Sequence, residues 1–357
     1  MEVLLLGGTG AMGVHVSNLL AQSGAHVTVT SRKKRVDKEN ITYVVGNAKD
    51  MAFLETLCQT HWDAILDFMV YTVESLQERI DLLLSSTAQY IFFSSARVYA
   101  DQKEPIREDA PRLLDACDDA AYLQTNEYAL EKARQENVLF ACDKKNWTIV
   151  RPSLTYGEER LQLGVYEKEN WLYRALHGRS IVFSNDLTEK CYTLTYAGDV
   201  AKGIVALVGS EQALGEAYHI VVDKAYTWND ILAVYVETLE KVTGKTPRVV
   251  FTDTSTNLQL PRAKYQVLYG RYFNRTFDNA KIRAFTDTSS WVDAKEGLAA
   301  CLTSFLENPV FLGIDWAKEG LIDRAAKEWT PLKEIPGIKR KLIYLKYRLG
   351  ILQTKNT

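Results

Sequence analysis

The chain has 357 residues, of which 46% are hydrophobic and 25% charged, and its 43 basic and 45 acidic side chains give a net charge of −2. This balance argues against nucleic-acid binding as the main function, because such modules usually carry a strong basic excess. With 8 prolines and 20 glycines, the chain is neither collagenous nor a long disordered segment. No apolar run approaches the roughly 18 residues that span a bilayer.

The start of the chain and its cysteines favour the cytoplasm. The apolar run that follows Glu2 is too short for the core of a signal peptide and has no basic start. The cysteines are scattered and odd in number, which predicts neither a disulfide framework nor a metal cluster; they are Cys58, Cys117, Cys142, Cys191 and Cys301. We expect buried or half-buried thiols, no bound metal and a cytoplasmic protein.

The first 155 residues alternate short apolar runs with helical patterns. The pattern predicts strands at Val3–Leu6, His26–Thr30, Ile41–Val45, Ala64–Phe68, Tyr90–Phe93 and Thr148–Val150. It predicts helices at Val14–Gln22, near Val73–Leu84 and over Tyr122–Cys142. Strands that alternate with helices form a parallel sheet covered on both faces, so we predict a Rossmann-type, doubly wound α/β fold.

The second half is less regular and contains no linker or internal repeat. We predict helices at Tyr166–Leu176, Asp199–Leu207, Trp228–Val242 and Ala294–Glu307, and strands at Ala217–Val221 and Arg248–Phe251. Residues 1–155 should form the Rossmann domain, to which about 193–222 return. Residues 156–192 and 223–330 should form a smaller, interwoven C-terminal lobe that binds the substrate, and 331–357 a basic amphipathic tail.

A glycine-rich turn joins the first predicted strand to the first predicted helix. Glycines at positions 7, 10 and 13 permit a tight turn and a close approach of backbone amides to a pyrophosphate. The start of the helix adds partial positive charge at the same place. We expect this turn to bind a dinucleotide through Gly7, Thr9, Gly10, Ala11, Met12 and Gly13.

The end of the second predicted strand bears on which dinucleotide is bound. An acidic residue that binds the adenosine ribose is common at this point, but here the chain reads Ser31-Arg32-Lys33. Arginine is suited to bidentate phosphate binding, so Arg32, helped by Ser31, favours the 2′-phosphate of NADP over NAD. The alternative, a solvated basic loop in a protein that uses NAD, stays open.

Tyr128 and Lys132 form a Tyr-x-x-x-Lys pattern within a predicted helix, so their side chains share one face. A phenol with a pKa of about 10 in water is a poor base at neutral pH, but a neighbouring ammonium lowers that pKa. Tyr99 and Lys103 have the same spacing, but they begin a loop before Pro105. We therefore assign Tyr128 as the acid/base and Lys132 as its partner and as a ligand of the nicotinamide ribose.

These motifs resemble those of the extended short-chain dehydrogenase/reductases, the NAD-dependent epimerase/dehydratase family. Two further segments share the resemblance: Ser94-Ser95-Ala96-Arg97-Val98-Tyr99 and Arg151-Pro152-Ser153-Leu154-Thr155-Tyr156-Gly157. The resemblance runs from residue 1 to about 305. It implies that Ser95 is the catalytic hydroxyl, which stabilises a developing alkoxide. It also implies that Pro152 lies by the nicotinamide, that Asn47 lies near the adenine, and that the Tyr128 helix takes part in a homodimer contact.

The sequence departs from the family pattern at three points. The fourth strand ends in Asp67-Phe68-Met69-Val70-Tyr71, which resembles an atypical branch that includes the chloroplast stem-loop-binding proteins. Ala96 and Arg97 replace the Asp-Glu pair of the 4,6-dehydratases, so elimination of water is disfavoured. The arginine that sugar-nucleotide epimerases place seven residues before the Asp199 position is Tyr192, with Lys190 as the residue that could compensate.

Residues 333–357 contain seven basic residues and one acidic residue, Glu334, for a local charge of +6, interleaved with Ile and Leu. A basic amphipathic helix of this kind either packs its apolar face on the second lobe or lies on an anionic membrane surface or a partner. We favour packing.

We therefore predict an NAD(P)-dependent oxidoreductase or epimerase that transfers a hydride between the nicotinamide and a sugar. The resemblance implies that the sugar is nucleotide-activated. It should be a 4-ketoreductase or 4-epimerase and not a 4,6-dehydratase. The alternative from another class is a non-catalytic NAD(P)-binding sensor or an RNA-associated relative of the same fold. The intact set of Ser95, Tyr128 and Lys132 counts against that alternative, and the near-neutral charge counts against RNA.

Overall fold

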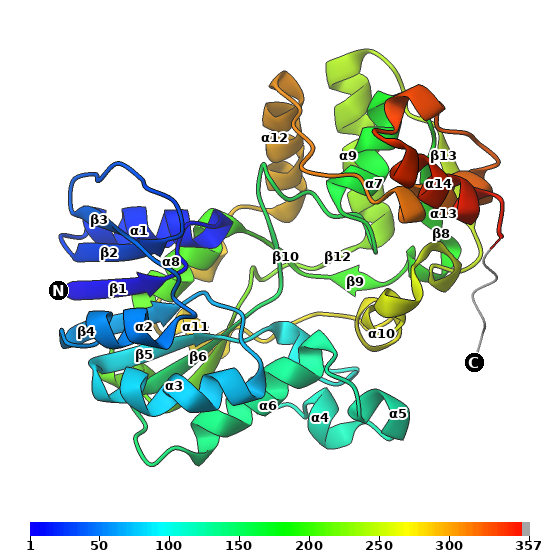
Figure 1. Ribbon diagram of the computed structural model, residues 1–357. Coiled ribbons are helices and arrows are strands. Elements are labelled where there is room, and N and C mark those ends of the chain that lie inside the picture. The colour runs from blue at the N-terminus through cyan, green and yellow to red at the C-terminus, as the bar shows by residue number, and fades with distance from the viewer. Residues whose placement is uncertain (352–357) are drawn as a thin grey trace. The chain divides into compact units, whose positions relative to one another are not determined.

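The computed structural model (Figure 1) describes residues 1–351 and divides the chain into two compact units. Unit 1 consists of Met1–Thr155, Thr193–Lys224 and Thr276–Val292, and unit 2 of Tyr156–Tyr192, Ala225–Arg275 and the chain from Asp293 onward. No helix among the described residues is long and apolar enough to cross a membrane.

Unit 1 is built on a seven-stranded sheet in the order β11-β6-β5-β4-β1-β2-β3, and every pair of neighbours is parallel. The order reverses between β1 and β4, as in a doubly wound fold. The predicted Rossmann-type fold is therefore confirmed. The strands are β1 (Glu2–Leu6), β2 (His26–Ser31), β3 (Ile41–Val45), β4 (Trp62–Asp67), β5 (Thr87–Phe93), β6 (Trp147–Pro152) and β11 (Glu216–Ile220).

Helices cover both faces of this sheet (Figure 1). Alternate residues of a strand point to opposite faces, so Val3 and Leu5 pack with α1 (Ala11–Gln22) and α8 (Ala197–Leu207). Leu4 and Leu6 pack on the other face with α2 (Met51–Leu57), α3 (Val73–Ser85) and α6 (Tyr128–Ala141). Burial on both faces explains why the strands read as continuous apolar runs.

The helical pattern predicted over Tyr122–Cys142 is broken in the structure. A short helix, α5 (Ala120–Leu123), ends before α6 begins at Tyr128. Thr125 donates its hydroxyl to Tyr122 O (2.7 Å), and the Glu127 carboxylate accepts the N–H of Ala129 (2.8 Å). Local side-chain bonds to the backbone thus stop one helix and cap the next.

The largest difference between the unit boundaries and the expected lobes concerns residues 276–292. Residues 276–292, expected in the second lobe, belong to unit 1. Ile106 donates its N–H to Thr276 O (2.9 Å), and the Asn279 amide donates to Val221 O (2.8 Å). These bonds between distant segments have no signature in the local sequence.

Unit 2 is mostly helical. α9 (Trp228–Thr243) begins with a capping box of Thr227 and Asp230, and α12 (Ala294–Glu307) packs against it. α7 (Lys168–Leu176) contributes Trp171, which stacks on Tyr235 of α9 with ring centroids 4.4 Å apart. β8 (Ile181–Ser184) and β13 (Val249–Thr252) form a parallel pair, and α13 (Trp316–Ala326) packs against α14 (Ile338–Arg348).

The remaining elements are short. They are α4 (Leu113–Ala116), α10 (Lys264–Gln266), α11 (Ala280–Arg283), β7 (Leu154–Tyr156), β9 (Cys191–Tyr192), β10 (Leu194–Tyr196) and β12 (Tyr226–Thr227).

The predicted basic tail forms α14, which belongs to unit 2 and packs through the buried Tyr344 and the partly buried Leu345. Tyr344 of α14 is fully buried, but Ile338, Leu342 and Leu349 are 77%, 61% and 54% exposed. The favoured expectation that the apolar face packs on the second lobe is therefore confirmed for Leu345 and wrong for these three residues, because Tyr344 and Leu345 face the interior instead. Residues 352–357, the end of the predicted tail, lie outside the described residues.

We predict that Gly13→Ala destabilises unit 1 and that Gly10→Ala does so much less. A Cβ at Gly13 would lie 2.5 Å from the backbone oxygen of Gly8, whereas a Cβ at Gly10 would meet nothing within 4 Å. Overpacking of this kind costs about 1–3 kcal/mol, more than the intrinsic helix preference of alanine returns. Thermal unfolding of both variants measures the difference, and equal melting temperatures would contradict it.

Candidate active site

The glycine-rich turn lies between β1 and α1, as predicted. Gly7 has φ +73°, and its N–H donates to Thr30 Oγ1 (2.8 Å) on the neighbouring strand β2. Gly10 is the N-cap of α1, so Ala11 and Met12 begin the helix. The backbone N–H groups of the first turn carry the partial positive charge of the helix end, which is suited to a pyrophosphate.

Arg32 follows the last residue of β2 and is exposed, whereas Ser31 is buried. The Ser31 hydroxyl donates to Lys33 O (2.8 Å) and accepts the N–H of Lys33 (3.3 Å). Ser31 therefore shapes the turn from which Arg32 extends. Asn47 is exposed after β3, where its side-chain oxygen accepts the N–H of Lys49 (3.2 Å).

Ser95 and Tyr128 belong to two segments that a salt bridge joins. Ser95 follows β5 and caps a short 3-10 turn by accepting the N–H of Arg97 (3.2 Å). The Arg97 guanidinium binds the Glu127 carboxylate (2.8 Å) and lies 5.9 Å from the centroid of the Tyr128 ring. Tyr128 is 43% exposed at the first turn of α6, so a ligand could reach its phenol.

Lys132 lies one turn farther along α6 and is only 4% exposed. Its Nζ lies 3.3 Å from Gln135 Oε1 and 4.7 Å from the centroid of the Phe92 ring. Burial lowers the pKa of Lys132 to about 8, and the Asp67, Glu136 and Glu131 carboxylates oppose this effect. Both the charged and the neutral form of the Lys132 amine are therefore populated near physiological pH.

Asp67 is a buried carboxylate at the end of β4, and sequence reasoning noted it only as a departure from the family. It accepts hydrogen bonds from the N–H of Met69 (3.0 Å) and from the hydroxyls of Tyr90 (2.9 Å) and Tyr71 (3.3 Å). Burial raises the pKa of Asp67 to about 6, against these bonds and the charge of Lys132. The Gln135 amide donates to Tyr71 O (2.6 Å), so the same glutamine contacts both Lys132 and the Asp67 loop.

Glu136 fixes α6 to the sheet. Its carboxylate is fully buried and accepts from Ser94 Oγ (2.6 Å) and from Arg151 Nε and Nη2 (2.7 and 2.9 Å). Arg112 is a third residue that binds this carboxylate, at 3.2 Å. The residue after Arg151, Pro152, ends β6 and is buried.

The second Tyr-x-x-x-Lys pattern is differently placed. Tyr99 is fully buried, and its hydroxyl accepts a hydrogen bond from Arg151 Nη1 (2.9 Å). Burial raises the pKa of Tyr99 above its usual value. This environment suits packing better than proton transfer.

Unit 2 carries a guanidinium beside Tyr192, where the sequence lacks the family's arginine. The Arg271 guanidinium carbon lies 5.5 Å from the centroid of the Tyr192 ring, and Arg271 Nε donates to Gly164 O (2.8 Å). The Tyr192 hydroxyl donates to Gly270 O. Arg271 is distant in sequence from Tyr192, so motif spacing could not identify it.

Comparison with known proteins identifies the family of this chain. The model of the NAD dependent epimerase/dehydratase family matches residues 3–222. The chain belongs to this family. Membership confirms the resemblance drawn from the motifs.

One curated relative is the chloroplast stem-loop binding protein of 41 kDa b from Arabidopsis thaliana, 25% identical over 248 residues. The match covers 64% of this chain and 61% of the relative, so the chain spans about three fifths of that protein's length.

Solved structures share the fold at low identity. The UDP-glucuronic acid 4-epimerase from Bacillus cereus, in complex with UDP-glucuronic acid and NAD, is 17% identical with a TM-score of 0.64, over 87% of this chain and all of that one. WbmH from Bordetella bronchiseptica, in complex with NAD+, is 17% identical with a TM-score of 0.60, over 87% of this chain and 99% of that one.

We predict that Asp67→Asn lowers the pKa of Lys132 below about 8, by about one pH unit. The carboxylate stabilises the ammonium, and a neutral amide cannot. The ¹³Cε chemical shift of labelled Lys132, assigned with Lys132→Gln, reports the titration. Glu131→Gln is the matched control, since Glu131 gives the smallest of the opposing contributions. An unchanged titration in Asp67→Asn would show that Asp67 does not act on Lys132.

Proposed function

We propose that the protein transfers a hydride at C4 of a nucleotide-activated sugar, as a 4-ketoreductase or a 4-epimerase. The observation that carries the proposal is the arrangement of Tyr128, Lys132 and Ser95. An accessible phenol begins α6, a buried lysine follows one turn later, and the hydroxyl-bearing segment is joined to the same helix end by the Arg97–Glu127 salt bridge. We also propose that it works in the cytoplasm, where its five free thiols stay reduced.

The residues at the ends of β1 and β2 fit a dinucleotide. Gly13 leaves room for the approach of α1 to Gly8, and the first turn of α1 offers backbone N–H groups to a pyrophosphate. Lys132 would hold the nicotinamide ribose, Pro152 would lie by the nicotinamide, and Asn47 would lie near the adenine. A bound nicotinamide would supply the acceptor or the donor for the hydride of the sugar carbon.

Tyr128 exchanges the proton that accompanies this transfer. Its phenol takes the proton of the sugar hydroxyl during oxidation and donates one to the keto oxygen during reduction. The charged form of Lys132 favours the phenolate by electrostatic attraction, so the environment that keeps Lys132 charged also determines the basicity of Tyr128. Ser95 donates a hydrogen bond to the same substrate oxygen and stabilises negative charge on it.

Two features narrow the reaction and the substrate. Neither Ala96 nor Arg97 carries the carboxylate that elimination of water requires, and Arg97 is held by Glu127. This disfavours a 4,6-dehydratase. Unit 2 would bind the nucleotide part of the substrate, with the Arg271 guanidinium as the diphosphate contact in addition to Lys190. The Bacillus cereus epimerase, which binds UDP-glucuronic acid, suggests that sugar nucleotide as the first probe.

NADP(H) is the proposed cofactor, although the structural neighbours named above were solved with NAD. Ser31-Arg32-Lys33-Lys34-Arg35 contains no carboxylate to accept the ribose hydroxyls of NAD, and Arg32 is exposed for a phosphate. An exchangeable NADPH would suit net reduction of a 4-keto sugar. A tightly retained NAD, released on denaturation and identified by mass spectrometry, would instead indicate a redox-neutral epimerase.

We expect Arg32→Ser to weaken NADP(H) binding by about tenfold or more while NAD binding changes little, because a charged hydrogen bond to the 2′-phosphate is lost. Fluorescence titration of the emptied protein with both dinucleotides measures this. Arg35→Ser is the control, since Arg35 lies in the same basic run beside Tyr43. Equal losses for the two dinucleotides would refute the assigned role of Arg32.

The rival function is that of a non-catalytic dinucleotide sensor or an RNA-associated protein. The similarity to the Arabidopsis relative, which is named a stem-loop binding protein, supports this rival. The net charge of −2 and the intact Ser95, Tyr128 and Lys132 favour the enzyme.

Replacement of Tyr128 separates the two functions. We expect Tyr128→Phe to lower kcat by about 10²–10⁴-fold, because the acid/base is removed, and to leave the dissociation constant of the dinucleotide within a few-fold. The assay measures conversion of UDP-glucuronic acid, and separately reduction of 4-keto sugar nucleotides, with either dinucleotide. Tyr347→Phe, on α14, is the control for loss of a tyrosine hydroxyl.

Full turnover by Tyr128→Phe would disprove the proposed chemistry. Dinucleotide binding without turnover of any sugar nucleotide by the wild-type protein, together with specific binding of a stem-loop RNA, would establish the rival.

A further inference from the structure

α14 is held in a fixed orientation within unit 2. The Tyr344 hydroxyl donates to Asp323 Oδ2 (2.7 Å) and accepts the N–H of Thr330 (2.9 Å). A Cβ on Gly320 of α13 would lie 2.6 Å from Tyr344 O, so the two helices approach closely. One face of α14 is thus committed to the interior of unit 2.

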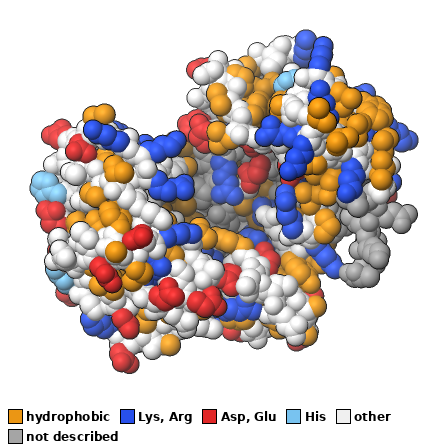
Figure 2. All heavy atoms as spheres, viewed as in Figure 1, with side chains coloured by type: hydrophobic (Ala, Val, Ile, Leu, Met, Phe, Trp, Pro, Cys, Tyr) orange, Lys and Arg blue, Asp and Glu red, His pale blue; other side chains and the backbone are white. Residues whose placement is uncertain are grey.

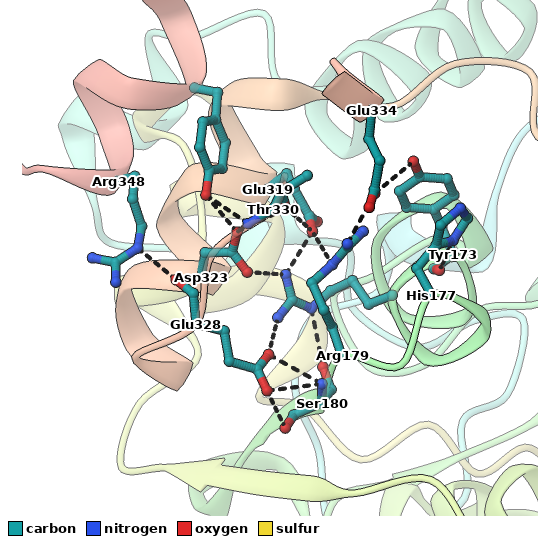
Figure 3. A network of polar contacts seen from close by, with 12 residues as sticks. Tyr173, His177, Arg179, Ser180, Glu319, Asp323, Glu328, Thr330, Glu334 and Arg348 are labelled. Carbon is teal, nitrogen blue, oxygen red and sulfur yellow. Dashed lines mark hydrogen bonds and ion pairs between the residues drawn. The ribbon is translucent and has the colours of Figure 1, made fainter. Parts of the chain in front are cut away.

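The carboxylates beneath α14 are paired with buried arginines (Figure 3). Arg174 of α7 binds Glu319 (2.6 Å), Asp323 (2.7 Å) and Glu328 (2.7 Å). Glu334 binds Arg179 at 2.9 Å. Glu328 also pairs with Arg248, so each of these four carboxylates is engaged in an ion pair with an arginine of unit 2.

The opposite face of α14 presents an exposed apolar stripe. Ile338, Leu342 and Leu349 are 77%, 61% and 54% exposed, and their spacing of four and seven residues places them on one side of the helix. Ile351, just after the helix, is 69% exposed. Leaving such side chains in water is unfavourable, because burial of apolar area stabilises by roughly 25 cal/mol per Å².

Basic side chains flank this stripe on both sides. Lys346 lies one turn from both Leu342 and Leu349, and Lys341 lies on the other side, one turn from Ile338. Lys339 and Arg340 add to the charge, and residues 335–351 contain no Asp or Glu. Figure 2 shows orange and blue side chains interleaved over the part of unit 2 where Figure 1 places α14.

An exposed tryptophan lies beside the helix. Trp329 is 51% exposed, and the Arg348 guanidinium carbon lies 4.3 Å from the centroid of its ring. The other six tryptophans of the chain are buried. Tryptophan is enriched at the boundary between water and lipid.

We propose that the α14 face, made of Ile338, Lys341, Leu342, Lys346 and Leu349, binds the surface of an anionic phospholipid bilayer. The helix has 11 residues, too few to span a bilayer, so it would lie in the plane of the headgroups with the apolar stripe inserted. The lysines on either side would remain at the level of the phosphates, where each basic residue is attracted to the negative surface.

Charge favours a bilayer over a second copy of this chain. A symmetric pair of α14 faces would bring the same lysines together, and like charges would oppose the contact. A negatively charged bilayer would bury the apolar stripe and attract the lysines on its two sides. The proposal is independent of the reaction that the enzyme catalyses.

The test is co-sedimentation of the full chain with sucrose-loaded vesicles. We expect binding to vesicles of equal parts phosphatidylglycerol and phosphatidylcholine, no binding to phosphatidylcholine alone, and weakening by added salt. Intrinsic fluorescence should shift to the blue on binding, because Trp329 is the exposed tryptophan. Trp329→Phe should remove this shift without removing sedimentation.

Two pairs of variants locate the surface. We expect each of two double variants to lower the partition coefficient for anionic vesicles by at least about tenfold. One combines Leu342→Ser with Leu349→Ser, and the other combines Lys341→Glu with Lys346→Glu. The matched controls lie at exposed positions of α9 and the loop after it. Val242→Ser is the control for the leucine variant, and Lys241→Glu combined with Lys245→Glu is the control for the lysine variant. Both controls should leave vesicle binding unchanged. Circular dichroism confirms that each variant is folded.

Failure of the wild-type chain to bind anionic vesicles would overturn the proposal, as would binding that the α14 variants leave unchanged. A dimer in sedimentation equilibrium that Leu342→Ser dissociates, without any vesicle binding, would assign the face to a second copy. An acidic protein partner that blocks the face in the absence of vesicle binding would overturn the proposal as well.

Discussion

The buried carboxylate of Glu136 is the contact on which the candidate active site depends. It lies in the middle of α6 and binds Ser94, at the end of β5, and Arg151 of β6. These buried bonds tie α6 to β6 and to the residue after β5, and removal of one partner from such a pair is strongly destabilising. Tyr128 and Lys132 are positioned by this helix, and Ser95 follows Ser94 directly. One ionic contact therefore fixes the segments that carry all three candidate catalytic side chains.

A second group of buried charges acts on reactivity more than on position. Lys132 and Asp67 are both almost fully buried, and burial disfavours the charged form of each. Their mutual attraction counteracts that effect, and Gln135 contacts both the lysine and the loop after Asp67. Hence the departure from the family pattern at Asp67-Phe68-Met69-Val70-Tyr71 affects the electrostatic surroundings of Lys132, a candidate catalytic residue.

Unit 2 uses the same physical device for a different purpose. Arg174 gathers the carboxylates of α13 and its flanking loop in the interior, which holds the α13–α14 pair in place. The consequence is a helix whose outer face is both apolar and positively charged. In both units, buried ion pairs determine which side chains remain available to ligands.

The sequence alone determined the fold class, the glycine-rich turn and the Tyr128–Lys132 pair, because these depend on short-range periodicity and on residue types at fixed spacing. It could not determine that α6 begins at Tyr128, that residues 276–292 join unit 1, or that Arg271 lies beside Tyr192. Those features depend on hydrogen bonds and packing between segments far apart in the chain. The orientation of α14 was likewise decided only by tertiary structure, because an amphipathic pattern shows that a helix has two faces but not which of them a buried Tyr344 turns inward.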